Sequence, residues 1–171
     1  MAAHLPWDEL VPLHYAALFR YAYRLTGSRS DAEDLTQEAF CSAQAKQSQL
    51  REPERVKSWL FSILHNAFLL QQRRRRQARF HSWDEWVEQD ITMAEAAELP
   101  VEVEQLQAAL MEIPDTFRAV LVLYYFEEFS YQEIADQLKI PLGTVMSRLA
   151  RAKRFLKTRL LSRDRTLEHE E

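Results

Sequence analysis

Glycine and cysteine are scarce in this chain, and several common signatures of enzymes and secreted proteins are missing. The 171 residues include two Gly, six Pro and one Cys, Cys41. So few turn-forming residues leave little room for a sheet with tight reversals. A single cysteine excludes an internal disulfide and fits a reducing cytoplasm. The sequence has no Cys/His spacing of the zinc-binding kind and no Gly-rich phosphate loop. We therefore expect an all-α protein without a metal or other cofactor.

The chain also lacks the segments that carry proteins into or across membranes. Its first residues do not combine a basic start with an apolar core, as a secretory signal does. No apolar run reaches the length of a membrane span. These features predict a cytoplasmic protein with no membrane insertion.

The net charge of −4 hides an uneven distribution of charge along the chain. Residues 51–81 contain eight Lys or Arg against two acids, and residues 139–165 contain nine against one. Residues 82–115 contain ten acids and no Lys or Arg. This pattern predicts two small helical domains, 1–81 and 105–165, joined by an acidic linker (82–104) and followed by a tail (166–171). Basic segments of this kind are typical of proteins that bind nucleic acid.

The segment from Ser130 to Lys157 predicts a helix-turn-helix. Ser130 and Glu133 form a capping box at the start of one helix, and Pro141 interrupts the helical pattern before the next. Val145, Leu149 and Ala152 recur at helical spacing as the core stripe of the second helix. The basic side of that helix is suited to the major groove of duplex DNA. The candidate contacts on and beside that side are Thr144, Met146, Ser147, Arg148, Ala150, Arg151, Arg154 and Lys157.

Three of these candidates differ in what they can recognise. Arg151 can contact a guanine or a phosphate, and the sequence leaves both options open. Met146 and Ala150 can make only apolar contacts, for example with a thymine methyl group.

An acidic helix face is predicted near the amino terminus. The periodicity indicates one helix over about residues 7–25 and a second that begins near Ser30, with Glu33 completing a capping box. The polar face of the second helix carries Asp31, Asp34, Gln37 and Glu38, together with Cys41. Such a face can bind a basic partner, can hold a divalent metal if other helices add ligands, or can simply be solvated. The face alone does not decide between a partner and plain solvation.

A third helix is predicted from about Pro53 to Phe80, with a buried stripe that includes Leu60 and Ile63. Phe61, His65 and Phe68 lie opposite that stripe and are followed by the run Arg73, Arg74, Arg75 and Arg76. Exposed aromatic rings beside arginines suit single-stranded nucleic acid, because rings stack on bases and arginines neutralise phosphates. The alternative is that both Phe side chains pack against a neighbouring helix. The arginine run favours nucleic acid.

Three segments, in this order, resemble the extracytoplasmic-function (ECF) sigma factors of bacterial RNA polymerase. DAEDLTQEAF at residues 31–40 resembles the family's motif for binding the polymerase clamp. WLFSILHN at 59–66, with the arginine run, resembles the segment that melts and reads the minus-ten element. IPDTFR at 113–118 and IPLGTV at 140–145 resemble the region that reads the minus-thirty-five element. Met146 stands where an Arg is common in the family, which puts the exact promoter sequence in question.

The resemblance implies a transcription initiation factor without catalytic residues of its own. The acidic face would bind core RNA polymerase, and the second domain would bind duplex promoter DNA. An anti-sigma factor is implied as a further partner by the resemblance alone. The residues implied for single-stranded minus-ten DNA are Trp59, Phe61, His65, Asn66, Phe68, Arg73, Arg74, Arg75 and Arg76.

Two other interpretations compete with this one. A free-standing helix-turn-helix regulator would act without polymerase core binding, and it would need neither the acidic face nor the aromatic–arginine helix. A helical metalloenzyme built on Asp31, Asp34 and Glu38 would contain stoichiometric metal.

Overall fold

The computed structural model describes residues 5–77 and 103–167, and every regular element in those ranges is helical. The prediction of an all-α protein is therefore confirmed. The predicted linker lies outside the described residues except for its last two positions, Val103 and Glu104, which begin a helix. The predicted tail is described only as far as Leu167. None of the described helices is both long and apolar enough to cross a membrane.

The amino-terminal half contains three long helices and two short 3-10 turns. They are α1 (Trp7–Thr26), α2 (Arg29–Ala45), η1 (Gln47–Gln49), η2 (Pro53–Arg55) and α3 (Val56–Gln77). Ser28 caps α2, because its backbone is extended and its side chain accepts a hydrogen bond from the Asp31 N–H. The predicted capping box at Ser30 is wrong, since Ser30 already lies inside the helix.

The carboxy-terminal half contains four helices, and its last two form the predicted helix-turn-helix. The helices are α4 (Val103–Met111), α5 (Asp115–Tyr125), α6 (Tyr131–Leu138) and α7 (Leu142–Leu167). The capping box at Ser130 is confirmed: Ser130 accepts from the Glu133 N–H, and the Glu133 carboxylate accepts from the Ser130 N–H at 2.8 Å. Lys139 ends α6 in the left-handed conformation, with φ 54°. Ile140 and Pro141 then lead into α7.

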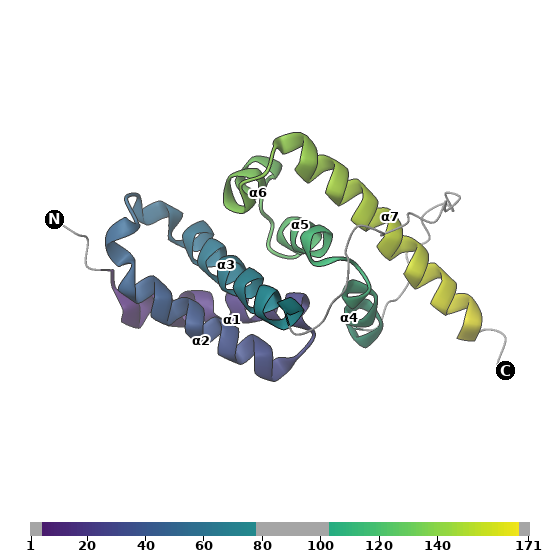
Figure 1. Cartoon of the computed structure of the whole chain (residues 1–171), viewed down its shortest axis with the longest axis horizontal. Coiled ribbons are helices and arrows are strands. Elements are labelled where there is room, and N and C mark those ends of the chain that lie inside the picture. The colour runs from purple at the N-terminus through teal and green to yellow at the C-terminus, as the bar shows by residue number, and fades with distance from the viewer. Residues whose placement is uncertain (1–4, 78–102, 168–171) are drawn as a thin grey trace.

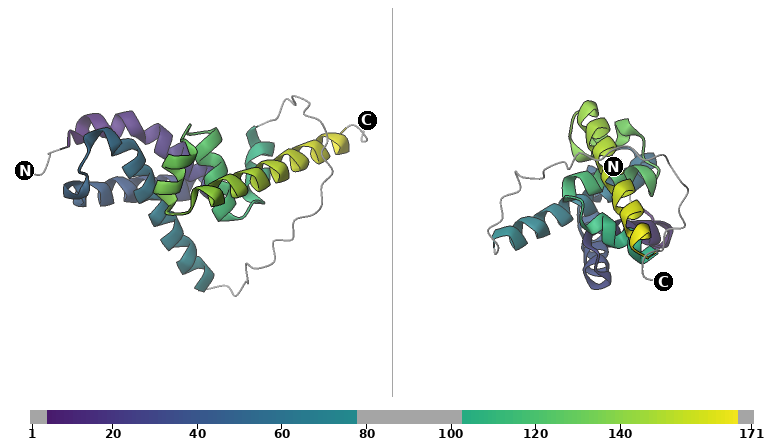
Figure 2. Two further views of the ribbon diagram at one scale, coloured as in Figure 1. Left: turned by 90° about the horizontal axis from the view of Figure 1, so that it is seen from above. Right: turned by 90° about the vertical axis from the view of Figure 1, so that its right-hand side faces the viewer.

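The two halves share one hydrophobic core. Figure 1 shows α5 and α6 beside α1 and α3, and contacts between these helices join the halves. Gly27, with φ 69°, lets α4 approach closely, because a Cβ there would lie 2.8 Å from the Met111 sulfur. Helix α7 extends away from the shared core toward the carboxy terminus (Figure 2).

Buried Arg118 ties α5 to both sides of this core. Its guanidinium donates to the backbone oxygens of Leu25 in the amino-terminal half and of Leu110 and Ile113 in its own half. It also pairs with Asp115 at 3.1 Å. Because one side chain supplies donors to three carbonyl groups near the ends of α1 and α4, it fixes where those helices meet.

Candidate nucleic-acid interface and acidic helix face

The acidic face of α2 lies on the surface, as the sequence predicts. Asp34, Gln37 and Glu38 are exposed, whereas Asp31 is half-buried and accepts a hydrogen bond from Arg75 of α3 at 3.0 Å. Helix α2 uses its opposite side, which includes Leu35 and Ala39, to pack against α1 and α3. The face can therefore meet a basic surface without disturbing the core.

No cluster of three or more His, Cys, Asp or Glu with metal-binding geometry occurs in the described parts of the chain. Cys41 is exposed beside the acidic face. It lines a shallow pocket of about 430 Å³ between α1 and α2, together with Trp7 and Phe40.

The expectation that Phe61, His65 and Phe68 face solvent is wrong. Phe61 and Phe68 are fully buried, and His65 is 7% exposed. The Phe61 ring lies 5.2 Å from the Tyr21 ring and 5.1 Å from the Phe129 ring, centre to centre. The physical reason is the central position of α3, which packs against α1 and α2 and also against α6. These side chains are packing residues in this conformation, not stacking platforms.

One signal in the sequence could have revealed this burial. Buried apolar side chains occur on more than one side of α3, because Ile63 and Phe61 lie about 160° apart around the helix axis, with Leu60 and Leu64 between them. A helix that is apolar around most of its circumference is generally buried on more than one face.

His65 is held as a neutral core residue. Its Nδ1 lies 3.0 Å from the Tyr21 hydroxyl, and burial lowers the pKa of His65 to about 4. Burial also raises the pKa of the Tyr21 hydroxyl well above its usual range. The pair is therefore uncharged at neutral pH, and His65 does not add positive charge for a phosphate.

A groove with a volume of about 660 Å³ runs along the exposed side of α3. Two predicted residues, half-buried Trp59 and exposed Asn66, line it. The other residues of this wall were not predicted as site residues. They are Lys46, Gln49, Leu50, Arg51, Glu52, Arg55, Ser58 and Ser62, and Ile63 of the predicted buried stripe also lines the wall. Two of them, Arg51 and Arg55, are among the eight Lys or Arg of the basic segment 51–81. This wall thus carries an indole ring, an amide and three cations, of which Arg55 is paired with Glu52.

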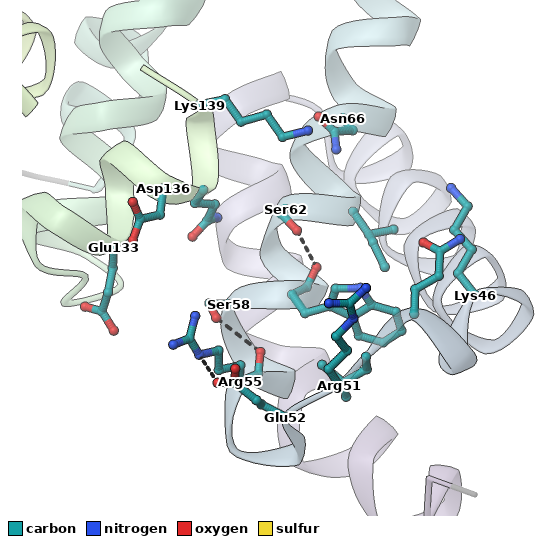
Figure 3. Close-up of a pocket in the computed structure, with 15 residues that line it drawn as sticks. Lys46, Arg51, Glu52, Arg55, Ser58, Ser62, Asn66, Glu133, Asp136 and Lys139 are labelled. Atoms are coloured by element: carbon teal, nitrogen blue, oxygen red, sulfur yellow. Dashed lines mark hydrogen bonds and ion pairs between the residues drawn. The ribbon is translucent and has the colours of Figure 1, made fainter. Parts of the chain in front are cut away.

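The opposite wall of the groove comes from the other half of the molecule. Glu133, Asp136, Gln137 and Lys139 of the helix-turn-helix line it. Figure 3 shows the Lys139 side chain extending toward Asn66, with Asp136 and Glu133 on the same side of the groove. Sequence analysis could not bring these residues together, because they are far apart along the chain.

The arginine run is exposed at the end of α3, but it also makes ion pairs. Arg75 pairs with Asp31, and Arg76 pairs with Asp115 of α5 at 3.1 Å. Arg73 and Arg74 are exposed in the same turn. Two of the four predicted phosphate contacts thus join α3 to other helices in this conformation.

The predicted faces of α7 are largely as expected. Val145, Leu149 and Ala152 are buried, as the core stripe requires. Met146 is 50% exposed, and Ser147, Ala150 and Arg154 are also exposed. Thr144 and Lys157 are half-buried. The first turns of α7 therefore present small and apolar groups, with basic residues further along.

Arg148 and Arg151 are less exposed than the sequence suggested. Their guanidinium groups lie 5.8 and 5.1 Å from the centre of the Phe117 ring, within the range of a cation–π contact. Both side chains are half-buried, and burial lowers the pKa of Arg148. Helix α5 thus orients two cations of α7.

A helix-turn-helix whose second helix is basic, attached to a helical domain with an exposed acidic face, defines a DNA-binding transcription factor. Two family models match the sequence. The model of Sigma-70 region 2 matches residues 10–79, and the model of Sigma-70, region 4 matches residues 103–156. The chain belongs to the family of ECF RNA polymerase sigma factors. Family membership supports the interpretation as a sigma-type initiation factor over those of a free-standing regulator and a metalloenzyme.

Several sigma factors are similar to this chain along most of its length. ECF RNA polymerase sigma factor SigE of Mycolicibacterium smegmatis is 40% identical over 91% of this chain, which spans 62% of that protein. ECF RNA polymerase sigma factor SigM of Bacillus subtilis is 30% identical, over 88% of this chain and 92% of that protein.

Solved structures of similar chains include the sigma factor RpoE of Bartonella quintana in complex with the anti-sigma factor NepR. It superposes with a TM-score of 0.74 and 28% identity, over 90% of this chain and 96% of that one. The structure of CnrH in complex with the cytosolic domain of CnrY has the same fold, with a TM-score of 0.65, 23% identity and coverage of 96% and 89%.

Proposed function

We propose that this protein directs core RNA polymerase to specific promoters and helps to melt them, acting in the cytoplasm and without catalytic residues of its own. The observation that carries the proposal is the pairing of two surfaces on one chain. One is the exposed acidic face of α2, and the other is the exposed first turns of α7 in a helix-turn-helix. A regulator that bound DNA alone would have no use for the first surface.

The face of Asp34, Gln37 and Glu38, with Asp31 at its edge, binds core polymerase in this proposal. Complementary charge steers such an encounter and fixes its orientation. Asp34→Lys with Glu38→Lys should weaken binding to purified core polymerase, while thermal unfolding stays nearly unchanged because both sites are exposed. The matched control is Glu104→Lys with Glu128→Lys, which reverses two exposed carboxylates in the other half. Equal binding by both double variants would contradict the assignment.

The minus-ten strand enters the groove beside α3 in this proposal. Trp59 and Asn66 contact a base, with the Trp59 ring stacking on it, and Arg73 and Arg74 neutralise phosphates. Loss of one stacking ring generally costs about 1–3 kcal/mol of single-strand affinity. Trp59→Ala should therefore reduce promoter melting. Permanganate footprinting in the presence of core polymerase measures the extent of melting. Normal melting by this variant would remove the groove from the proposal.

Helix α7 reads the minus-thirty-five element, mainly through apolar contacts and the DNA backbone. Met146→Ala should change the preference at one base pair, because an exposed methionine can touch a thymine methyl group. Lys157→Ala should weaken binding to all DNA sequences alike. It should also reduce by about one the slope of the logarithm of the binding constant against the logarithm of the salt concentration. Binding curves on a substituted promoter library at two salt concentrations separate the two effects. A Met146→Ala variant with unchanged preferences would contradict the reading role.

An anti-sigma factor is a further proposed partner. The support is the similar Bartonella quintana sigma factor, whose solved structure is a complex with the anti-sigma factor NepR. Affinity purification of the protein from its host should recover a stoichiometric partner that lowers its activity in transcription. Full activity of the native protein without such a partner would count against this part of the proposal.

A further inference from the structure

Two large apolar side chains are exposed at the start of α7. Leu142 is 43% exposed and Met146 is 50% exposed. Residues four apart lie on the same side of a helix, so the two side chains form one apolar row. Leu142 was not among the predicted DNA contacts. Because burial of apolar surface is favourable, this row is suited to an apolar group of a ligand.

The residues beside the apolar row are small and leave it open to a ligand. A Cβ at Gly143 would have no atom of another element within 4 Å. Ser147 and Ala150 follow on the next turns, and both are exposed. Figure 1 shows this end of α7 beside α6, at the opposite end of the helix from the carboxy terminus. A broad surface such as a DNA groove can therefore approach the row closely.

The hydrogen-bonding side chains of the same turns are engaged within the molecule. The Ser147 hydroxyl donates to the Thr144 carbonyl oxygen at 3.2 Å. The Arg148 and Arg151 guanidinium groups lie against the Phe117 ring of α5. An arginine that reads guanine must instead extend its guanidinium to the O6 and N7 atoms of the base. The apolar row is therefore better placed than these side chains to touch a base edge.

The charge around the apolar row favours DNA as its ligand. Residues 142–162 include six Lys or Arg and no Asp or Glu. Lys153 and Arg154 are exposed on the turns that follow the row. Such a surface attracts the phosphate backbone. Within the major groove, the apolar group on the base edges is the 5-methyl group of thymine.

The dimensions of the row match neighbouring base pairs. Residues four apart are separated by about 6 Å along a helix axis, and successive base pairs by about 3.4 Å along DNA. A row of this length spans one to two base steps. Leu142 and Met146 lie in the first two turns of α7, and it is the amino-terminal residues of a recognition helix that contact base edges.

We propose that Leu142 and Met146 together read the 5-methyl groups of two thymines, one or two base steps apart, in the minus-thirty-five element. Leu142 is then a further residue that determines promoter specificity. The group that is recognised is the methyl group and not a hydrogen-bonding pattern, so uracil is a poor substitute for thymine. This inference rests on the proposed role of α7 in reading the minus-thirty-five element.

The test removes single methyl groups from the DNA and needs no protein variant in its first step. Holoenzyme made from the full chain and core RNA polymerase selects preferred sites from a random-sequence duplex pool. Each thymine of the selected upstream element is then replaced by uracil opposite an unchanged adenine. Binding should weaken about fourfold at each of two neighbouring positions, as expected for one buried methyl group. At the same positions, 5-methylcytosine paired with guanine should bind more tightly than cytosine by a similar factor.

Protein variants then assign each methyl group to a side chain. Leu142→Ala should abolish the preference for thymine over uracil at one position, and Met146→Ala should abolish it at the other. Met146→Leu keeps an apolar side chain and should retain the preference. Leu13→Ala is the matched control, because Leu13 is 71% exposed on α1 in the other half. It should leave both preferences unchanged.

The outcomes separate this inference from the proposed function. A pool that yields no preferred sequence refutes promoter reading itself. A preferred site that binds equally well with thymine and with uracil overturns the methyl assignment, whereas promoter reading stands. The role of Leu142 is also overturned if Leu142→Ala weakens binding to core polymerase and leaves the preference for thymine intact, because the apolar row would then contact protein.

Loss of folding does not obscure these results. Both side chains of the row are about half exposed, so their truncation should cost little stability. The uracil and 5-methylcytosine measurements use the parent chain and decide the methyl assignment on their own.

Discussion

Glu127 is a buried carboxyl group at the junction of the two halves, and its replacement gives the sharpest test of how they pack. The side chain is 5% exposed, and its Oε1 has no hydrogen-bond partner among the described residues. Burial raises the pKa of Glu127 to about 7, although nearby Arg20, Lys57 and Arg24 act in the opposite direction. Desolvation therefore outweighs the attraction of three cations, and the charged form is held at a cost.

The sign of the pH dependence follows from this raised pKa. The folded protein binds the Glu127 proton more tightly than the unfolded chain, whose pKa is about 4.5. Stability from this group is thus greatest below about pH 4.5 and is lost as the pH rises through about 7. One pKa unit corresponds to about 1.4 kcal/mol. Allowing for solvent screening, the penalty at pH 8 is on the order of 1–2 kcal/mol.

Glu127→Gln removes that charge while keeping the shape of the side chain. The variant should be more stable than the parent chain by on the order of 1–2 kcal/mol at pH 8, or roughly 2–8 °C in Tm. The difference should vanish near pH 4.5. Urea and thermal unfolding at several pH values measure it, and comparison of variant with parent cancels the titration of other groups, including His65.

The matched control is Glu128→Gln, since Glu128 is exposed one residue further along. It should change stability by less than about 0.5 kcal/mol at either pH. A Glu127→Gln variant that is less stable than the parent at pH 8 would refute the reasoning, because the cations would then outweigh desolvation.

Three further predictions concern packing and capping. Phe61→Ala should lower the free energy of unfolding by about 3–5 kcal/mol in urea denaturation, as expected for a buried ring; a loss below about 0.5 kcal/mol would mean that the ring is exposed in solution. Arg118→Leu should cost about 3–5 kcal/mol in the same assay, because buried Asp115 loses a partner and three carbonyl groups lose their donor. Ser130→Ala should cost about 1 kcal/mol in thermal unfolding through loss of the α6 cap, and an unchanged Tm would show that this cap is dispensable.

The sequence by itself determined the helical class, the helix-turn-helix and the exposed acidic face. These features depend on local patterns. The Ser130–Glu133 capping box acts within one turn, and the stripe of Val145, Leu149 and Ala152 follows helical periodicity. Even there, the cap of α2 was misplaced by two residues, because an acidic residue stands three positions after both Ser28 and Ser30 and only the backbone conformation distinguishes the two serines.

The tertiary structure alone decided which faces of the helices are covered. Phe61 and Phe68 look like an exposed pair when α3 is considered with one partner, but α6 packs on a second side and the Phe129 ring covers Phe61. The groove likewise joins Asn66 to Lys139. Helical periodicity identifies the sides of a helix, whereas burial depends on how many neighbours pack against it. Those neighbours come from distant parts of the chain, where local patterns carry no information.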